Sequence, residues 1–323
     1  MKVLITGASG FIGHHLVDFL YKEGFKIRCL VRKTSNVKNI ADKSELVYGE
    51  ITVPESLPDA VKDVDYIIHG AAIVKALSPS EYYKVNTIGT INLFKAVLKN
   101  NPSLKRFVYI SSQAASSPSE TPISEDYPSS PVTHYGKSKL EAEKFLEVNY
   151  DKIPITIIRP SAVYGTYDKE FLPVYKMIKY GFEILVKGGK TKLSMVYVKD
   201  LVKSIFLAMT SEKTIGKKYF SAHPEVIYLS DFYREIEKSI GKKFVLRIPI
   251  PVSLLYILAF FNTSFSKVIG KPSMFNYDKI NEIKNSWVCC SENIVKDTGM
   301  KYEYPISIGV PETIKWALDN KLI

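Results

Sequence analysis

The chain is poor in the features that mark disulfide-bonded, membrane-spanning and nucleic-acid-binding proteins. It has 3 cysteines, Cys29, Cys289 and Cys290, which are too few for a disulfide framework and suit a reducing compartment. No apolar run reaches the roughly 20 residues that cross a bilayer. Although the net charge is +11, the basic residues are scattered and form no stripe with aromatic residues. We therefore expect a cytoplasmic protein with no transmembrane segment and no nucleic-acid partner.

Metal-ligand patterns are also missing. The chain has 5 histidines, and none is spaced with cysteines or carboxylates as metal ligands are. Hydrophobic residues make up 46% and charged residues 24% of the 323 residues, an ordinary composition for a chain with a large core. The sequence thus predicts no metal site, and a fold of one large or two closely joined domains.

The first 20 residues predict a binding site for a dinucleotide. An apolar run at residues 3–5 leads into a glycine-rich turn, and helical periodicity resumes at residues 15–20. Gly7 allows the tight turn, Gly10 lets backbone N–H groups approach a pyrophosphate, and Gly13 lets the helix pack closely on the sheet. The start of the helix adds unpaired N–H donors. The residues of this turn predicted to bind the cofactor are Gly7, Ser9, Gly10, Phe11, Ile12 and Gly13.

The first half of the chain alternates short apolar runs with helical patterns, as βαβ units do. The runs are continuously apolar, which is typical of parallel strands covered on both faces. The pattern predicts an α/β fold with a doubly wound parallel sheet. Its predicted strands are residues 26–31, 45–48, 65–69, 106–110 and 155–158, and its predicted helices include residues 82–99 and 135–149.

After residue 160 the pattern becomes less regular. Residues 194–198 are typical of a returning strand, and residues 200–210 of a helix that rejoins the first domain. A smaller, α-rich region begins near residue 224. We therefore expect two domains. The cofactor-binding domain comprises residues 1–163 and 194–222, and the substrate-binding domain comprises mainly residues 164–193 and 223–323.

Tyr135 and Lys139 are the strongest candidates for catalysis. Their spacing of four residues places them one turn apart on the same face of a helix. A nearby ammonium lowers the pKa of a phenol, so that the tyrosine becomes a usable acid or base. A surface tyrosine–lysine pair has the same spacing, but this pair follows the fifth strand of a chain with a dinucleotide turn. Ser111 and Ser112 end that strand, where a hydroxyl can bond a substrate oxygen.

Short motifs support this interpretation, because TGASGFIG, HGAA, VNTIGT, ISS, YGKSK, RPSAVYG and VYVKDL follow one another over about the first 210 residues. With them the chain resembles the extended short-chain dehydrogenases/reductases of the NAD-dependent epimerase/dehydratase superfamily. It is nearest to dihydroflavonol reductases and the 3β-hydroxysteroid dehydrogenase-like group. The resemblance implies a Rossmann-type domain with a parallel sheet of about seven strands, a smaller C-terminal substrate domain, and hydride transfer at the nicotinamide C4.

The resemblance also assigns roles to residues. It implies that Tyr135 is the acid or base, that Lys139 holds the nicotinamide ribose and lowers the tyrosine pKa, and that Ser112 polarises the substrate oxygen. Ser111 is then structural. Asn86 matches the helix asparagine that supports a proton relay, although an asparagine bonding its own helical turn explains the same residue equally well.

The loop after the second predicted strand favours NADP(H). Sites for NAD usually have a carboxylate there, whereas an arginine accommodates a 2′-phosphate. Arg32 occupies this place, Lys38 follows, and no acidic residue occurs before Asp42. The sequence therefore predicts NADP(H) as the preferred cofactor, with NAD(H) as the alternative. The further predicted cofactor contacts are Glu50, Ile51, Ala71, Ala72, Tyr135, Lys139, Pro160 and Val163.

The same scaffold also supports nucleotide-sugar epimerases and dehydratases. Such enzymes usually hold the sugar nucleotide with an asparagine after the sixth strand and an arginine before the returning strand. Here Ser161 and Lys192 stand in these regions, and Lys192 would lose the bidentate phosphate contact. These departures favour an NAD(P)-dependent oxidoreductase that reduces a ketone or oxidises a secondary alcohol of a small, apolar or ring-containing substrate. A nucleotide-sugar epimerase or dehydratase, and a non-catalytic NADP(H) sensor, are the alternatives.

The apolar run at residues 252–261 predicts a helix of the C-terminal core. A contact with a membrane surface or with a second copy of the chain is the alternative interpretation of this run. The expected partners are therefore a small-molecule substrate and, in a homodimer, a second copy.

Overall fold

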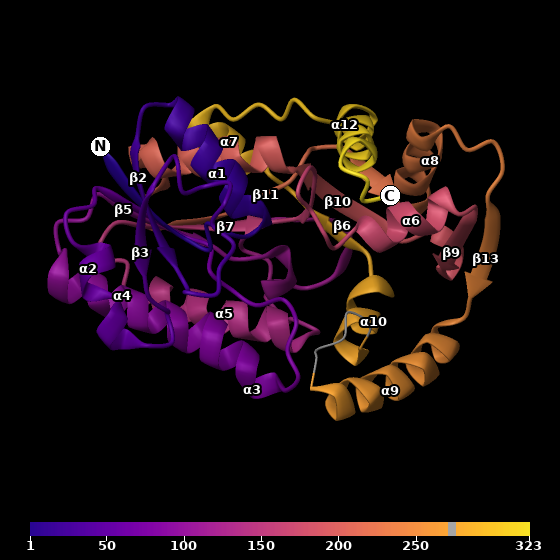
Figure 1. The fold of residues 1–323 in the computed structure, drawn as a ribbon, viewed down its shortest axis with the longest axis horizontal. Coiled ribbons are helices and arrows are strands. Elements are labelled where there is room, and N and C mark those ends of the chain that lie inside the picture. Colours follow the sequence, from indigo (N-terminus) through magenta and orange to yellow (C-terminus); the bar gives the residue numbers. More distant parts are fainter. Residues whose placement is uncertain (271–275) are drawn as a thin grey trace.

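A seven-stranded parallel sheet forms the middle layer of the larger part of the molecule, on the left in Figure 1. The structure is a computed structural model that describes residues 1–270 and 276–323. The strand order is β11-β7-β5-β4-β1-β2-β3, so the chain winds outward from β1 in both directions, as the sequence predicts. The strands are β1 (Lys2–Thr6), β2 (Lys26–Val31), β3 (Glu45–Tyr48), β4 (Tyr66–His69), β5 (Arg106–Ile110), β7 (Ile155–Pro160) and β11 (Lys217–Ser221).

Helices cover both faces of this sheet because its strands carry apolar side chains on both sides. Successive side chains of a strand point to opposite faces. In β1, Ile5 therefore packs toward α1 and α7, whereas Leu4 packs toward α2, α4 and α5. These helices are α1 (Phe11–Lys22), α2 (Pro58–Val61), α4 (Gly89–Asn100), α5 (His134–Glu147) and α7 (Val198–Thr210).

A second, five-stranded sheet contains the strand that was expected to rejoin the first domain. Strand β10 (Lys192–Tyr197) occupies that segment, but it pairs with β8, β12 and β14. A strand is therefore present in the segment expected at 194–198, but it joins the second sheet, where it pairs with β8, the strand that directly follows β7. Helix α7 and strand β11 return to the main sheet instead. The other strands of the second sheet are β6 (Ser119–Ile123), β8 (Ala162–Tyr164), β12 (Val226–Tyr228) and β14 (Trp287–Cys289).

The helix expected at residues 82–99 is not continuous. It is divided into α3 (Pro79–Tyr82), a π-helical turn called η2 (Tyr83–Ile88), and α4. π-helical turns are rare and often occur at functional sites. This one contains Asn86, whose side chain is buried.

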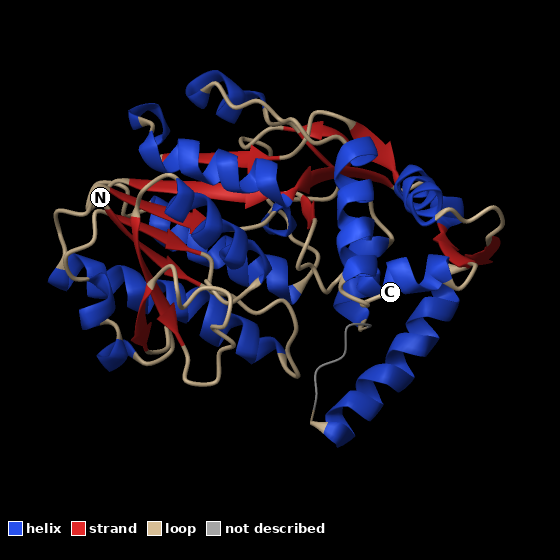
Figure 2. Ribbon diagram, turned by 45° about the horizontal axis from the view of Figure 1, so that its top comes forward, coloured by secondary structure: helices blue, strands red, loops and turns tan. Residues whose placement is uncertain are grey.

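The C-terminal part is smaller and mostly helical, as expected. Its main core forms where α6, α8 and α12 pack against β10, while β9 and β13 pair at the outer edge (Figure 2). Within the residues that the structure describes, no helix is long and apolar enough to cross a membrane. The remaining elements are α6 (Leu172–Lys179), β9 (Phe182–Val186), α8 (Leu229–Ile240), β13 (Leu246–Ile250), α9 (Val252–Ile269), α10 (Tyr277–Ile283), α11 (Glu292–Thr298), α12 (Ile306–Asp319), and the short 3₁₀ turns η1 (Pro54–Ser56), η3 (Gln113–Ala115), η4 (Lys187–Gly189) and η5 (Glu212–Thr214).

Helix α9 differs from the core helix expected at residues 252–261. Leu255 and Ala259 are buried against neighbouring elements, so one side of the helix does belong to a core. Ile257 and Phe261, on the other side, are exposed. The apolar run is therefore only half covered.

A buried ion pair fixes α5 to the main sheet. Arg159 of β7 donates from Nε and Nη2 to the Glu143 carboxylate, with N–O distances between 2.6 and 3.2 Å. Both side chains have no exposed surface. Arg159 also donates to the Ser129 hydroxyl at 3.1 Å. Because an unpaired charge at this depth is very unfavourable, these bonds define where α5 sits on the sheet.

Replacing one partner of this pair should destabilise the whole domain. We expect Glu143→Ala to lower the free energy of unfolding by about 3–5 kcal/mol, since Arg159 would remain buried without a counter-charge. Asp151→Ala, which removes an exposed pair with Lys152, is the control and should leave that free energy nearly unchanged. Urea denaturation of both variants measures the difference. Equal effects would show that the buried pair does not hold α5.

Candidate active site

Most of the predicted cofactor-binding residues lie at the carboxyl-terminal edge of the main sheet or in the segments that leave it, while Asn86, Tyr135 and Lys139 lie in η2 and α5. The chain winds in opposite directions from β1 and β4, and a doubly wound sheet binds its ligands beside such a switch point. This edge carries the glycine turn after β1, Arg32 and Lys38 after β2, Glu50 and Ile51 after β3, Ala71 and Ala72 after β4, Ser112 after β5, Pro160 at the end of β7, and Val163 in β8.

The glycine turn packs closely against the start of α1. Gly7 has a φ of +77°, and its amide carbonyl accepts the N–H of Gly10 at 3.0 Å. A Cβ on Gly13 would collide with the Gly7 carbonyl, so this glycine permits the close approach of helix and strand. Gly10 caps α1, and no side chain bonds the free N–H groups of the first helical turn. These unpaired donors at a helix N-terminus fit the phosphates of a dinucleotide.

Helix α5 brings Tyr135 against the end of β5. Thr133 caps the helix by accepting the N–H of Gly136 at 2.9 Å. Gly136 packs directly on the Ala114 carbonyl in the turn η3, where a Cβ would not fit. The hydroxyl of Ser112 caps the same turn by accepting the N–H of Ala114 at 3.1 Å. The close packing of α5 on η3 therefore sets Tyr135 beside Ser112.

Tyr135 and Ser112 interact through their hydroxyl groups. Burial raises the pKa of the Tyr135 phenol to about 12, while the hydrogen bond with the Ser112 side chain acts to lower it. Ser111 differs from Ser112 because it is buried and its hydroxyl has no partner among the described residues. Of the two serines, Ser112 is thus the one that faces the phenol.

Lys139 lies one turn after Tyr135 on α5 and is buried. Its Nζ donates to the Ile110 carbonyl at 2.7 Å and lies 4.4 Å from the ring centre of Tyr109. Burial lowers the pKa of Lys139 to about 7, and the Glu143 carboxylate opposes this shift. The sequence predicts that Lys139 lowers the pKa of the phenol, but the structure gives a raised value. Burial of the phenol causes this rise in its pKa, and the group that opposes the rise is Ser112.

Asn86 connects the π-helical turn to two other parts of the site. Its side-chain amide accepts the N–H of Ile73 at 2.9 Å and donates to the Ile73 carbonyl at 3.1 Å. It also donates to the hydroxyl of Ser138 at 3.0 Å. Asn86 therefore bonds other segments through its side chain, and it ties the loop after β4 to the helix that carries Tyr135.

A buried hydrogen-bond chain below these residues was not predicted from the sequence. Thr90 donates to the Asn86 carbonyl at 2.6 Å, so its hydroxyl oxygen is left to accept the Nε2–H of His69 at 2.9 Å. The hydroxyl of Thr6 then donates to His69 Nδ1 at 2.6 Å and accepts the N–H of Ala71 at 3.2 Å.

Within this hydrogen-bond chain the His69 ring is neutral, because burial lowers its pKa to about 3. The chain of bonds fixes the end of β4 against the glycine turn and the π-helical turn. In the sequence, the sign of this hydrogen-bond chain is His69, the residue directly before Gly70.

The predicted residues for cofactor choice have separate positions. Arg32 and Lys38 are exposed in the loop after β2, where the N–H of Arg32 donates to the Ser35 hydroxyl at 3.1 Å. Glu50 is also exposed. Ile51 is buried and packs against Gly89, and its carbonyl accepts from Asn92 at 3.0 Å. The side chains of Arg32 and Lys38 are therefore accessible to a ligand, whereas Ile51 is part of the packed interior beside α4.

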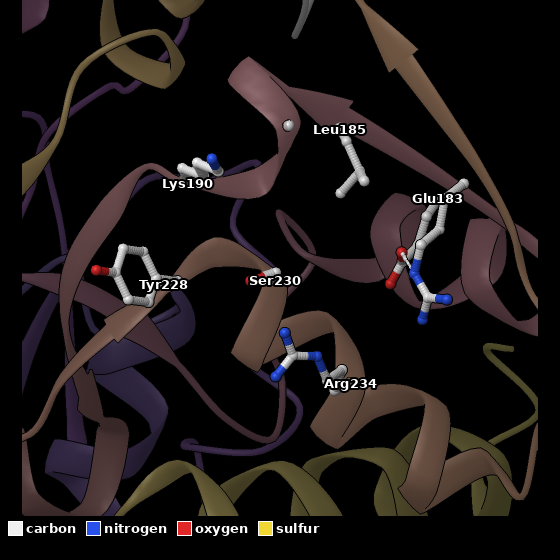
Figure 3. Close-up of a pocket in the computed structure, with 8 residues that line it drawn as sticks. Glu183, Leu185, Lys190, Tyr228, Ser230 and Arg234 are labelled. Atoms are coloured by element: carbon white, nitrogen blue, oxygen red, sulfur yellow. Dashed lines mark ion pairs between the residues drawn. The ribbon is translucent and has the colours of Figure 1, made fainter.

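A separate cavity of about 540 Å³ lies in the C-terminal part of the chain (Figure 3). Its most buried polar group is Glu183, whose carboxylate pairs with Arg247 at 3.0 Å. Burial and the neighbouring Glu237 carboxylate raise the pKa of Glu183 to about 7. None of Ser112, Tyr135 and Lys139 lines this cavity, so it is distinct from the site at the sheet edge. The lining residues are Glu183, Leu185, Gly188, Lys190, Tyr228, Ser230, Arg234 and Arg247.

Comparison with known proteins identifies the family to which the chain is similar. The sequence model of the NAD dependent epimerase/dehydratase family matches residues 3–220. The chain is 27% identical to an N-acetyl-alpha-D-glucosaminyl-diphospho-ditrans,octacis-undecaprenol 4-epimerase of Escherichia coli O157:H7, over 98% of this chain and 95% of that protein. It is 30% identical to a 3-beta-hydroxysteroid dehydrogenase of Mycolicibacterium neoaurum, over 75% of this chain and 71% of that protein.

A solved structure shares the fold. A dTDP-glucose 4,6-dehydratase of Bacillus anthracis, determined in complex with NAD, superposes with a TM-score of 0.78. The alignment covers 99% of this chain and 97% of the dehydratase, at 21% identity. This likeness concerns the fold alone.

The buried lysine should make stability depend on pH. The pKa of Lys139 is about 7 in the folded chain, below the ordinary lysine value, so between these two values the unfolded chain binds more protons. The contribution of this group to stability then rises with pH, by up to about 1.4 kcal/mol per pH unit. We expect Lys139→Met to remove that rise. Denaturation at about pH 7.5 and pH 9.5 should show a smaller difference in unfolding free energy for the variant than for the wild type; parallel changes would contradict the assignment.

Proposed function

This chain belongs to the NAD-dependent epimerase/dehydratase family, and from its site we propose that it is an NADP(H)-dependent oxidoreductase. The proposed reaction reduces a ketone, or oxidises a secondary alcohol, of a small apolar or ring-containing substrate. The observation that carries the proposal is the contact between the hydroxyls of Ser112 and Tyr135, at the start of the helix that also carries the enclosed amine of Lys139. A substrate oxygen that joins these two hydroxyls can be polarised and protonated in one place.

The proposed roles follow from the contacts of each residue. Ser112 bonds the substrate oxygen, and Tyr135 donates the proton to it during reduction or removes it during oxidation. A pKa of about 12 keeps Tyr135 protonated, which suits the donor role in the unliganded site. Lys139 and Asn86 hold the segments around the phenol, and Lys139 would also contact the nicotinamide ribose. When bound, the nicotinamide supplies or accepts the hydride.

The glycine turn and the loops beside it would hold the cofactor. We propose that residues 1–163 and 194–222 contribute most of this cofactor-binding part, apart from β6, β8 and β10, which belong to the second sheet. Residues 164–193 and 223–323 would then contribute most of the substrate-binding part. In the proposed arrangement the substrate enters between them, where α10 borders the Tyr135 side of the sheet edge.

Two relatives support different chemistries. The relative from Mycolicibacterium neoaurum is a 3-beta-hydroxysteroid dehydrogenase, which favours an alcohol–ketone exchange on an apolar ring. The relative from Escherichia coli is an epimerase for a lipid-linked sugar, and its similarity spans nearly the whole chain. A 4-epimerase acting on a sugar diphosphate is therefore the second candidate. Ser161, buried with its hydroxyl unbonded within the described chain, and the absence of an arginine before β10 favour the oxidoreductase.

Replacing Arg32 should change cofactor preference. We expect Arg32→Asp to weaken NADPH binding by about tenfold or more, because the guanidinium that would meet the 2′-phosphate is lost and a carboxylate suits the ribose hydroxyls of NADH. Lys22→Asp, at the exposed end of α1, makes the same change in charge away from the site and is the control. The ratio of kcat/KM for NADPH and NADH measures the effect; an unchanged ratio would reject Arg32 as the discriminating residue.

Replacing Tyr135 should separate chemistry from binding. We expect Tyr135→Phe to lower kcat by about 100- to 10,000-fold while NADPH affinity, measured by nicotinamide fluorescence, stays the same. Tyr83→Phe is the matched control. The Tyr83 ring packs against His134, the residue that directly precedes Tyr135. The substrates to test are steroid ketones, flavanonols and lipid-linked or nucleotide sugars.

The outcome of that panel distinguishes the candidates. Net consumption of NADPH with a ketone supports the oxidoreductase. Isomerisation of a sugar without net consumption would replace it with the epimerase. Tight NADPH binding with no turnover of any substrate would favour a sensor.

A further inference from the structure

Helix α9 has apolar side chains on two opposite sides. On the inner side Leu255 and Ala259 pack against Val186 of β9 and Ile280 of α10. The outer side carries a stripe with helical spacing i, i+3, i+4, i+7, which is between 41% and 64% exposed. A helix that is apolar all round is normally covered on every side. The residues of this α9 stripe are Leu254, Ile257, Leu258 and Phe261.

The sheet beside α9 continues the apolar surface. In the pairing of β9 with β13, Phe182 lies opposite Leu246 and Ile184 lies opposite Ile248. All four side chains are exposed. The next pair on the same face, Val186 and Ile250, is the one that α9 covers. The four exposed residues, called the β9–β13 face below, therefore extend outward from the inner side of α9.

These two surfaces lie together at one end of the molecule. Figures 1 and 2 both show α9 at the outer edge, following β13 and away from the main sheet. Eight large, exposed apolar side chains therefore gather at one end of the molecule, and gathered exposed apolar side chains mark interaction sites. Something of apolar character is needed to cover them.

The charges around these surfaces indicate which partner fits. Residues 252–263 contain no charged side chain. Lys187 and Lys190, in and after the turn η4 that follows β9, are exposed, and no acidic group pairs with either in the described ranges. Lys242 and Lys243, before β13, are also exposed. The apolar surface is therefore bordered by cations.

A lipid bilayer with anionic headgroups matches both properties. Its acyl region accepts apolar side chains, and its surface attracts nearby lysines, each by about fivefold in affinity. A second copy of the chain would instead place these lysines near the same lysines of the other copy. Their positive charges would repel, on a protein whose net charge is +11. The charge pattern thus selects the bilayer over a dimer.

We propose that the α9 stripe and the β9–β13 face dock on the surface of an anionic lipid bilayer. Helix α9 lies flat in this arrangement, because its inner side stays packed on β9 and α10. The docking goes beyond the proposed reaction and needs neither cofactor nor substrate.

The docking surface is joined to the candidate active site by one short helix. In α10, Asp278 accepts the N–H of His134, the residue before Tyr135, at 2.8 Å. Asn281 of the same helix accepts the hydroxyl of Tyr256 in α9 at 2.8 Å. An apolar substrate dissolved in the bilayer would therefore have a short path to Tyr135. This consequence, unlike the docking itself, rests on the proposed function.

Sedimentation with lipid vesicles tests the docking directly. We expect the full chain to bind vesicles of equal parts phosphatidylglycerol and phosphatidylcholine, and to bind pure phosphatidylcholine much more weakly. Ile257→Glu and Phe261→Glu should each reduce binding by about tenfold, because each replaces a large apolar side chain that the docked protein would bury in the lipid interface. Lys187→Gln should reduce it by about fivefold and only on the anionic vesicles.

The control replaces an equally exposed isoleucine elsewhere. Ile308 of α12 is 50% exposed, compared with 54% for Ile257, so Ile308→Glu should keep full vesicle binding. Thermal melting of each variant confirms that the fold is intact, as the replaced side chains are exposed. Absence of binding by the wild type, or undiminished binding by Ile257→Glu and Phe261→Glu, would overturn the proposal. A dimer that these variants dissociate, without vesicle binding, would assign the surface to a second copy.

The assay also separates the two proposals. If vesicles bind but no ketone is turned over, the docking stands and the reaction fails. If a ketone presented in water is reduced but vesicles do not bind, the reaction stands and the docking fails.

Discussion

The buried pair between Glu143 and Arg159 is the interaction on which the candidate site depends most. Glu143 lies one helical turn after Lys139 and two after Tyr135, so the position of its carboxylate sets the height and rotation of the whole helix α5. Arg159 directly precedes Pro160 at the carboxyl end of β7, so the same pair also fixes the strand that borders the site. The pair further faces the enclosed amine of Lys139 and partly restores its basicity. One pair of charges therefore positions the helix, the strand and the lysine together.

Much of the fold could be predicted because local patterns determined it. The glycine turn after β1, the strands at residues 26–31, 45–48 and 106–110, and the helix carrying Tyr135 all occur where their periodicity indicated. The partners of the strand at residues 194–198 could not be predicted in this way. The segment does form a strand, β10, which pairs with β8, β12 and β14 in the second sheet. Pairing between distant segments is not encoded in the pattern of either segment alone.

The candidate site shows the same limit at the level of single residues. The spacing of Tyr135 and Lys139 predicted that they share a helix face, and they do. It could not predict that Lys139 is enclosed so tightly that its own pKa falls to about 7, because burial depends on β5 and on Tyr109 above it. Nor could spacing show that residues 83–88 widen into a π-helical turn, which points the side chain of Asn86 at Ile73 and Ser138. Tertiary packing supplies this information.

The strand order has a consequence for the chain as it is being made. Strand β7 ends at Pro160, yet its outer edge is paired only by β11, which begins at Lys217. During synthesis the outer edge of β7 therefore stays unpaired while more than fifty further residues are added to the chain. Those residues include β9 and β10, apolar segments that could add to the same edge. The nascent chain therefore passes through an interval in which β9 and β10 are available to this edge before β11, its native partner, has been made.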